Sequence, residues 1–232
     1  MKRRDFVQVC AASVAGGAIP EGNTAGLSAR MYKRAKLVDD RRQPIRQADM
    51  KVGATYVFDY PFSATPCFLL RLDRPAAGGV LLKTETGYDY TWEGGVGPGR
   101  DVVAYSAICA HKMTYPTKQV SFIGYRNEPS PVAGTGKVIT CCSDRSVYDP
   151  AAGARVVSGP APQPLATIIL EYDKKADELY AVGTFGGEKF QEFFTKYAFR
   201  LQMEMGNRSR ETVEDFAVVK PLENYSTQWA KC

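Results

Sequence analysis

The stretch ITCCSDRSVYD, residues 139–149, combines candidate metal ligands and hydroxyl groups in a short turn that follows an apolar run. Cys141 begins the polar part, Asp144 follows three positions later, and Ser146 and Tyr148 come next at alternating positions. A thiolate suits soft metals and iron–sulfur clusters, whereas a carboxylate oxygen suits harder ions. The stretch therefore predicts a loop that surrounds a metal cofactor, although it lacks a histidine.

A second cysteine-bearing loop occurs earlier in the chain. DVVAYSAIC, residues 101–109, is typical of a buried strand that ends at Cys109, and His111 follows after one residue. A thiolate and an imidazole separated by one residue can both point into one pocket. Two such loops that face each other can hold a 2Fe-2S cluster with mixed cysteine and histidine ligands.

Together the loops resemble those of Rieske iron–sulfur proteins, with the pattern C-x-H, then C-x-x-[H]-x-S-x-[FY]-D, then GPAPQPL at 159–165. TPCFLLRLDRPAAGG (65–79) and GGVGPGRDVVAYSAICAHK (94–112) resemble the small exported Rieske subunit of arsenite-oxidase-type molybdenum enzymes. SGPAP (158–162) resembles the proline loop of cytochrome bc Rieske subunits. The resemblance covers roughly residues 50–185, without a known counterpart for the insert at 80–94 or for the C-terminal extension.

The resemblance implies an all-β fold, a Rieske-type antiparallel β sandwich with a small cluster-binding subdomain, to which a C-terminal helix and arm are added. The expected division of the chain is a signal or tether at 1–30, the Rieske-type domain at 31–186 and the helix and extension at 187–232. The cluster-binding part is expected at about 100–165.

Carried over position by position, the resemblance implies that Cys109 and Cys141 bind the inner iron and that His111 binds the outer iron. The second histidine of the family falls on Asp144, so that a carboxylate replaces the missing imidazole. Ser146 and Tyr148 fall where the family uses hydroxyl groups to hydrogen-bond the cluster sulfur. Thr114 and Ser143 fall where many members have a disulfide that braces the two loops, so this brace must be absent.

Three interpretations of Asp144 compete. It ligates iron directly, or Cys142, a solvent molecule or a partner completes the site, or the site has decayed and holds no cluster. Adjacent residues on extended backbone point apart, which counts against Cys142. As a ligand, the carboxylate would lower the reduction potential relative to a site with two histidines.

The favoured function is that of an electron-transfer subunit in an exported respiratory complex, working with a larger molybdopterin-type subunit and a periplasmic electron carrier. The alternatives are a quinol-oxidising subunit of a cytochrome bc-type complex and a cluster-free structural subunit. The chain is not expected to catalyse a reaction alone, because its single histidine, His111, is already assigned to the cluster.

The N-terminal stretch MKRRDFVQVCAASVAGGAIP resembles a twin-arginine export signal, with Arg3 and Arg4 ahead of a weakly apolar run. A periplasmic location follows, with a possible membrane tether if the segment is kept. The run at 6–19 is shorter than the roughly 20 residues that span a bilayer. A disordered basic N-terminus is the alternative.

The rest of the chain predicts strands and one helix. ATYVFDY (54–60) and CFLLRL (67–72) are expected to pair, 80–94 to form a strand or hairpin, and ATIILEYD and ELYAVG to be joined by a turn. Residues 21–50 are expected to be an extended lead-in. Phe190, Phe193, Phe194, Tyr197 and Leu201 lie at helical spacing within 188–205, which indicates one amphipathic helix.

The tail from 206 onward is either packed on the domain or an arm that reaches a partner. Cys67 is expected to be a buried core thiol, and Cys232 either free or linked to a partner.

Composition excludes several other classes of protein. The net charge of +5 comes from 30 basic and 25 acidic residues that are well mixed along the chain, so a nucleic-acid partner is not expected. One histidine rules out any zinc or iron site that takes two imidazoles from this chain. Six cysteines without regular spacing do not predict a disulfide framework in a chain of 232 residues.

Overall fold

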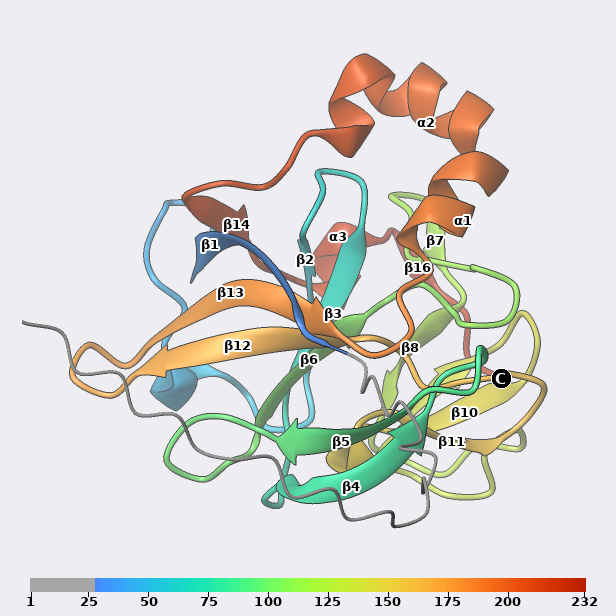
Figure 1. The fold of residues 1–232 in the computed structure, drawn as a ribbon, viewed down its shortest axis with the longest axis horizontal. Helices are drawn as coiled ribbons and strands as arrows, with labels where there is room; N and C mark the ends of the chain where they lie inside the picture. The colour runs from blue at the N-terminus through green and yellow to red at the C-terminus, as the bar shows by residue number, and fades with distance from the viewer. Residues whose placement is uncertain (1–27) are drawn as a thin grey trace, which may run out of the picture.

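The structure, a computed structural model, describes residues 28–232. Its largest element is a curved eight-stranded sheet with the strand order β14-β1-β13-β12-β6-β3-β2-β15 (Figure 1). These strands are β1 (Arg30–Val38), β2 (Thr55–Asp59), β3 (Pro66–Arg71), β6 (Val102–Ser106), β12 (Thr167–Asp173), β13 (Glu178–Phe185), β14 (Phe216–Val218) and β15 (Lys220–Pro221). The prediction of an all-β fold is confirmed.

The central strands are buried on both faces. Every residue of β6 is buried, and so are the first five residues of β3, which fits their continuous apolar sequences. β2 and β3 pair in antiparallel register from Thr55 opposite Leu70 to Asp59 opposite Pro66, as the sequence predicts. β12 and β13 form the expected hairpin.

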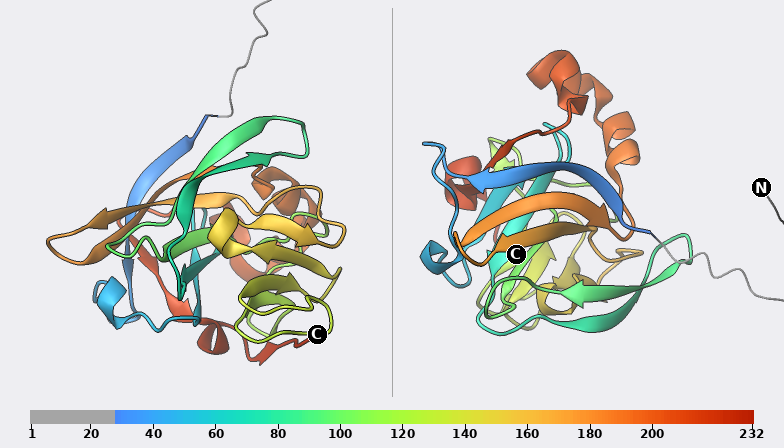
Figure 2. Two further views of the ribbon diagram at one scale, coloured as in Figure 1. Left: turned by 90° about the horizontal axis from the view of Figure 1, so that it is seen from below. Right: turned by 60° about the vertical axis from the view of Figure 1, so that its left-hand side comes forward.

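A smaller four-stranded sheet carries half of the candidate site. It contains β8 (Ile123–Arg126), β9 (Val138–Cys141), β10 (Ser146–Asp149) and β11 (Arg155–Ser158), in the order β11-β10-β9-β8. Figure 2 shows this sheet to one side of the large sheet, close to the C-terminus. A short strand, β7 (Val120–Ser121), precedes it.

The insert at 80–94 forms a hairpin of β4 (Ala77–Lys83) and β5 (Asp89–Gly94), as expected. It is anchored by Trp92, which is 2% exposed and whose ring centroid lies 6.3 Å from that of Tyr105. Tyr105 in turn donates a hydrogen bond to the carbonyl of Pro150, directly after β10. The hairpin therefore covers the core shared by the large and small sheets.

Two main cores hold these layers together. One fills the inner face of the curved sheet and includes Leu37, Phe58, Leu69, Ile168 and Leu179. The other lies between the large sheet, the small sheet and the hairpin, and it includes Phe68, Tyr105, Ile139, Tyr148 and Leu165. Because the second core contains residues next to both cysteine loops, the packing of the sandwich fixes the position of the candidate site.

The predicted single helix is two short helices, α1 (Phe190–Lys196) and α2 (Ala198–Met205), separated at Tyr197. The predicted apolar face is correct, since Phe190, Phe193, Phe194 and Leu201 are buried. They pack in a third cluster with Ala64, Ile108 and Tyr115. The helices thus cover the loop that contains Cys109.

The tail packs on its own domain, so that the alternative of an arm reaching a partner is wrong for these residues. β14 pairs with β1 and β15 pairs with β2, while the short helix α3 (Leu222–Tyr225) leads to β16 (Gln228–Trp229), which pairs with β7. The expectation of a simple extended lead-in is also wrong in part, because residues 30–38 are strand β1 of the large sheet.

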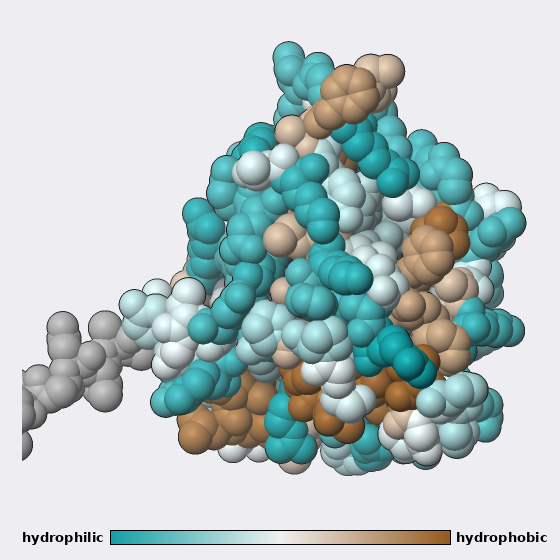
Figure 3. Space-filling view, turned by 90° about the vertical axis from the view of Figure 1, so that its right-hand side faces the viewer, coloured by the Kyte–Doolittle hydropathy of each residue, from teal (hydrophilic) through white to brown (hydrophobic). Residues whose placement is uncertain are grey.

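The predicted twin-arginine segment lies outside the described residues. Within residues 28–232, none of the helices combines the length and apolar character needed to cross a membrane. Figure 3 shows mostly polar residues over one face, with hydrophobic residues gathered along its lower edge. Exposed hydrophobic side chains include Leu81 of β4, Val157 of β11, and Phe199 and Met203 of α2.

The helix pair offers a test of the packing with a matched control. Phe193 of α1 is fully buried against Tyr115, whereas Phe199 of α2 is 81% exposed. We expect Phe193→Ala to lower the free energy of unfolding by about 3–5 kcal/mol, through lost burial and a cavity. Phe199→Ala should change it by less than about 0.5 kcal/mol. Urea unfolding measures both, and equal losses would contradict the packing described.

Candidate metal centre

Loop 1, residues 107–119, connects β6 to β7 and presents Cys109 and His111. Two backbone hydrogen bonds close its first turn, from the Cys109 N–H to the Thr114 carbonyl (2.8 Å) and from the Met113 N–H to the Cys109 carbonyl (2.9 Å). Met113 has a positive φ of 57°, which reverses the chain direction here. Cys109 is fully buried as a result, while the His111 side chain is 39% exposed.

Loop 2, residues 142–145, is the turn between β9 and β10. Ser146 pairs opposite Cys141 across these antiparallel strands, and the Arg145 N–H donates to the Cys141 carbonyl (2.8 Å). The Asp144 carboxylate accepts a hydrogen bond from the Ser146 N–H (Oδ1, 3.0 Å), which is the local bond expected of an aspartate in a turn. This bond orients Asp144 toward loop 1 rather than toward solvent.

The two loops bring the four predicted ligands together. One ligand atom each of Cys109, Cys141 and Asp144 lies within 4.8 Å of the others. Asp144 Oδ2 is 3.1 Å from Cys109 Sγ and 3.1 Å from His111 Nδ1. The Asp144 side chain is only 1% exposed. A buried carboxylate therefore lies where two thiols and an imidazole converge, although the assignment of the four as iron ligands stays a prediction.

The electrostatics of this cluster favour ionisation of Cys109 and Asp144 and oppose ionisation of Cys141. A hydrogen bond from the Cys141 thiol holds the pKa of Cys109 below its ordinary value, while that bond and burial raise the pKa of Cys141. Burial opposes ionisation of Asp144, but hydrogen bonds from the Ser146 N–H and the neighbouring thiols outweigh it, so that the pKa of Asp144 is lowered. One buried position thus holds a thiol with a lowered pKa and a carboxylate, two groups that bind metals in their ionised forms.

Two hydroxyl groups face the same position. The Tyr148 hydroxyl lies 3.3 Å from Cys109 Sγ and accepts a hydrogen bond from the Ala110 N–H (3.3 Å). Ser146 Oγ is buried and has no hydrogen-bond partner among the described residues. An unpaired buried hydroxyl costs about 1–3 kcal/mol unless a further acceptor satisfies it. The donor set and this unsatisfied hydroxyl fit an iron–sulfur cluster, whose sulfide would accept the missing bond.

The proline loop packs directly on loop 2. Gly159 has a φ of 90°, and a Cβ added there would lie 2.5 Å from the Arg145 carbonyl oxygen. Only glycine permits this close approach of the two backbones. The GPAP segment therefore covers the hairpin that presents Asp144.

The structure excludes Cys142 as the completing ligand, because Cys142 forms a disulfide with Cys232. The expectation that Cys232 is free or linked to a partner is wrong for the same reason. Cys142 and Cys232 are the two cysteines that remain when Cys109 and Cys141 are assigned to the candidate metal centre, Cys67 to the core and Cys10 to the N-terminal segment. Cys67 is the predicted core thiol, fully buried with its Sγ donating to the Tyr60 carbonyl (2.9 Å).

Thr114 and Ser143 lie on a cavity of about 480 Å³ beside the loops, together with Tyr115, Tyr197 and Arg200.

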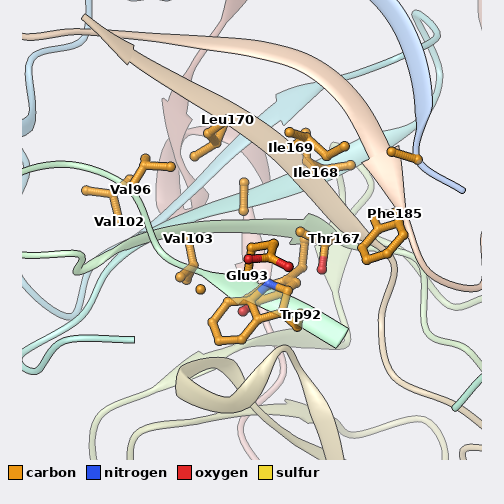
Figure 4. Close-up of a pocket in the computed structure, with 14 residues that line it drawn as sticks. Trp92, Glu93, Val96, Val102, Val103, Thr167, Ile168, Ile169, Leu170 and Phe185 are labelled. Atoms are coloured by element: carbon orange, nitrogen blue, oxygen red, sulfur yellow. The ribbon is translucent and has the colours of Figure 1, made fainter. Parts of the chain in front are cut away.

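A separate apolar pocket of about 270 Å³ lies where β6 and β12 diverge, since these strands pair only at Tyr105 and Thr167 (Figure 4). Trp92, Val103, Ile168 and Phe185 are among its lining residues, and none of the predicted ligands lines it. The candidate metal centre is therefore distinct from this pocket.

No family model matches the chain. The chain is 27% identical over 193 residues to "Iodate reductase subunit IdrB" of Denitromonas iodatirespirans, an alignment that covers 80% of this chain and 82% of the relative. The resemblance to a Rieske-type small subunit is confirmed. Among solved structures, the soluble domain of Rieske protein II (soxF) from Sulfolobus acidocaldarius is 28% identical, with a TM-score of 0.46, and the match covers 72% of this chain and 85% of that chain.

The similarity to IdrB supports a general class for the chain, a Rieske-like electron-transfer subunit of an oxidoreductase. It also implies an iron–sulfur cofactor.

Asp144 is the position that sets this site apart, and exchanging it tests its role. With a cluster bound at this site, removing one negative charge at about 4 Å from a redox centre, at an effective dielectric near 20, would be worth roughly 4 kcal/mol, or roughly 0.15–0.2 V for one electron. We therefore expect Asp144→His to raise the reduction potential by about that amount in a redox titration.

The control for this exchange is Asp149→Asn, which removes a charge from the end of the same hairpin. Asp149 caps the turn at 150–152 through the Ala151 N–H (2.9 Å) and does not face the thiols. It should shift the potential by much less. Equal shifts in the two variants would show a general charge effect rather than ligation by Asp144.

Proposed function

We propose that the chain is an electron-transfer subunit that carries a 2Fe-2S cluster held by Cys109, His111, Cys141 and Asp144. The single observation that carries the proposal is the convergence of these four side chains, from two separate loops, beside the buried and unpaired hydroxyl of Ser146. The confirmed resemblance to a Rieske-type subunit supports the same conclusion.

Each part of the site contributes a separate property. When bound, the cluster would supply reversible one-electron chemistry. Cys109 and Cys141 are fully buried and keep water away from the inner side. His111 is the most exposed of the four ligands and marks the surface through which electrons would enter or leave. Tyr148 fixes the position of loop 1 through its contacts with Cys109 and the Ala110 N–H.

We propose that the chain works with a larger redox subunit rather than as a catalyst alone. Its single histidine lies in the cluster site, and this leaves no imidazole for an independent Ser-His-Asp or Cys-His site. IdrB is named as a subunit of iodate reductase, which favours a larger oxidoreductase as the partner of this chain. We propose a molybdopterin-type partner and a periplasmic electron carrier.

We also propose export by the twin-arginine route, with the mature chain in the periplasm. The support is the Arg3-Arg4 pair at the start of the sequence and the disulfide between Cys142 and Cys232, since structural disulfides persist in oxidising compartments.

Metal and sulfide analysis tests the cofactor. We expect about two irons and two acid-labile sulfides per chain, with an electron paramagnetic resonance (EPR) signal on reduction, because a 2Fe-2S cluster has that composition. Cys109→Ser and Cys141→Ser should abolish the visible absorption, whereas Cys67→Ala should keep it because Cys67 lies in the core. One zinc ion without sulfide, or a colourless protein without metal, would contradict the proposal.

The partner and the compartment can be tested together with a tagged full-length chain in its native host. We expect the chain in the periplasmic fraction, bound to a larger subunit that contains molybdenum and pterin. Replacing Arg3 and Arg4 by lysine should retain the chain in the cytoplasm, because the twin-arginine pathway depends on the arginine pair. Periplasmic chain in this variant would overturn the export route, and co-purified b-type haem would instead favour a cytochrome bc-type complex.

A further inference from the structure

The C-terminal arm, residues 226–232, lies against both loops of the metal centre. On one side it follows loop 1 and the strand after it, through hydrogen bonds from Ser226 Oγ to the Thr117 carbonyl (2.6 Å) and from the Thr227 N–H to the Lys118 carbonyl (2.9 Å). β16 continues this contact by pairing in parallel with β7. On the other side, Cys232 is bonded to Cys142 in loop 2.

Arg126 on β8 secures the last turn of the arm. Its guanidinium donates to the Ala230 carbonyl (2.9 Å) and lies 5.4 Å from the ring centroid of Trp229. The Trp229 ring fits against Gly124, where an added Cβ would come within 2.9 Å of Trp229 Nε1. The arm is therefore held by packing and hydrogen bonds as well as by the covalent bond.

The direct hydrogen bonds between the loops involve the groups that a cluster would engage. Among the described residues, the side-chain bonds between loop 1 and the β9–β10 hairpin that contains loop 2 join Cys109, Ala110 and His111 to Cys141, Asp144 and Tyr148. Four of these six residues are proposed ligands, and their mutual contacts are not available once they bind iron. The bond from the Ala110 N–H to Tyr148 remains, and an element outside the site that also joins the loops would restrain loop 2 further.

We propose that the C-terminal arm is this element: the Cys142–Cys232 disulfide and Arg126 clamp loop 2 to loop 1 and so fix the position of Asp144 at the cluster. Cys142 directly follows the proposed ligand Cys141 and lies two positions before Asp144, so that an anchor at Cys142 restricts both. Thr114 and Ser143 contain no sulfur and cannot form a disulfide between the loops. They line a cavity instead. The inference rests on the proposed cluster function.

The test uses Cys142→Ser, Cys232→Ser and the double variant, each compared with the wild-type protein loaded with its cluster. An iron chelator should bleach all three about tenfold faster than wild type or more, because a disulfide restricts the opening of the loop that it closes. Their EPR lines should broaden and their potentials shift, and the double variant should match the singles. A weaker change is expected for Arg126→Gln, and none for the control Arg34→Gln, whose exposed side chain pairs with Glu171 on the large sheet.

Unchanged bleaching rates, EPR lines and potentials in variants that lack the disulfide would overturn the clamp. So would mass spectrometry that finds Cys142 and Cys232 unlinked in the native protein. Where a cysteine variant fails to fold, reducing the disulfide of the folded wild-type protein with a dithiol gives the same comparison.

A separate outcome concerns the proposed function. If the wild-type protein contains no iron or sulfide, that function fails. Hydrogen exchange at residues 141–146 then tests the clamp by itself. Faster exchange in the double variant than in wild type would support the clamp, and equal exchange would overturn it.

Discussion

The candidate site depends on one local hydrogen bond, from the Ser146 N–H to the Asp144 carboxylate, within the tight turn between β9 and β10. This bond turns the carboxylate inward, where its other oxygen contacts Cys109 and His111 of loop 1. Without it, Asp144 would be an ordinary exposed turn residue, and the cysteines would lack a charged neighbour. A local backbone bond thus places the carboxylate of a turn residue in the candidate metal centre.

The sandwich provides the rigid frame that this arrangement needs. Loop 1 follows β6, which is buried on both faces, and loop 2 connects β9 to β10 of the small sheet. Tyr105 and Tyr148 lie in the core shared by the two sheets. The Tyr105 hydroxyl donates a hydrogen bond to the Pro150 carbonyl, and the Tyr148 hydroxyl accepts one from the Ala110 N–H. The same packing that stabilises the fold therefore sets the distance between the two sources of ligands.

Much of the fold follows from local sequence patterns, because alternating or continuous apolar runs specify strands without reference to distant residues. The pairs β2–β3 and β12–β13 and the β4–β5 hairpin were predictable for this reason, as were the helical positions of Phe190, Phe193 and Phe194. The strand at 30–38 was not predictable, because a polar segment joins a sheet only when a distant edge is available. The break at Tyr197 was not predictable either, because the helical spacing of Phe193, Tyr197 and Leu201 continues across it. The gathering of Cys109, His111, Cys141 and Asp144 was predictable from spacing and resemblance, whereas the path of the tail was not.

The disulfide between Cys142 and Cys232 spans a sequence separation of 90 residues, and this imposes an order on the maturation of the protein. During synthesis, loop 2 emerges long before its covalent partner Cys232, so the disulfide is still absent at the stage when the proposed cluster would be inserted. In the proposed twin-arginine route, cofactor insertion takes place in the reducing cytoplasm and the bond closes only after translocation. Assembly would then run in one direction: the loop is filled while open and sealed when the protein reaches an oxidising compartment.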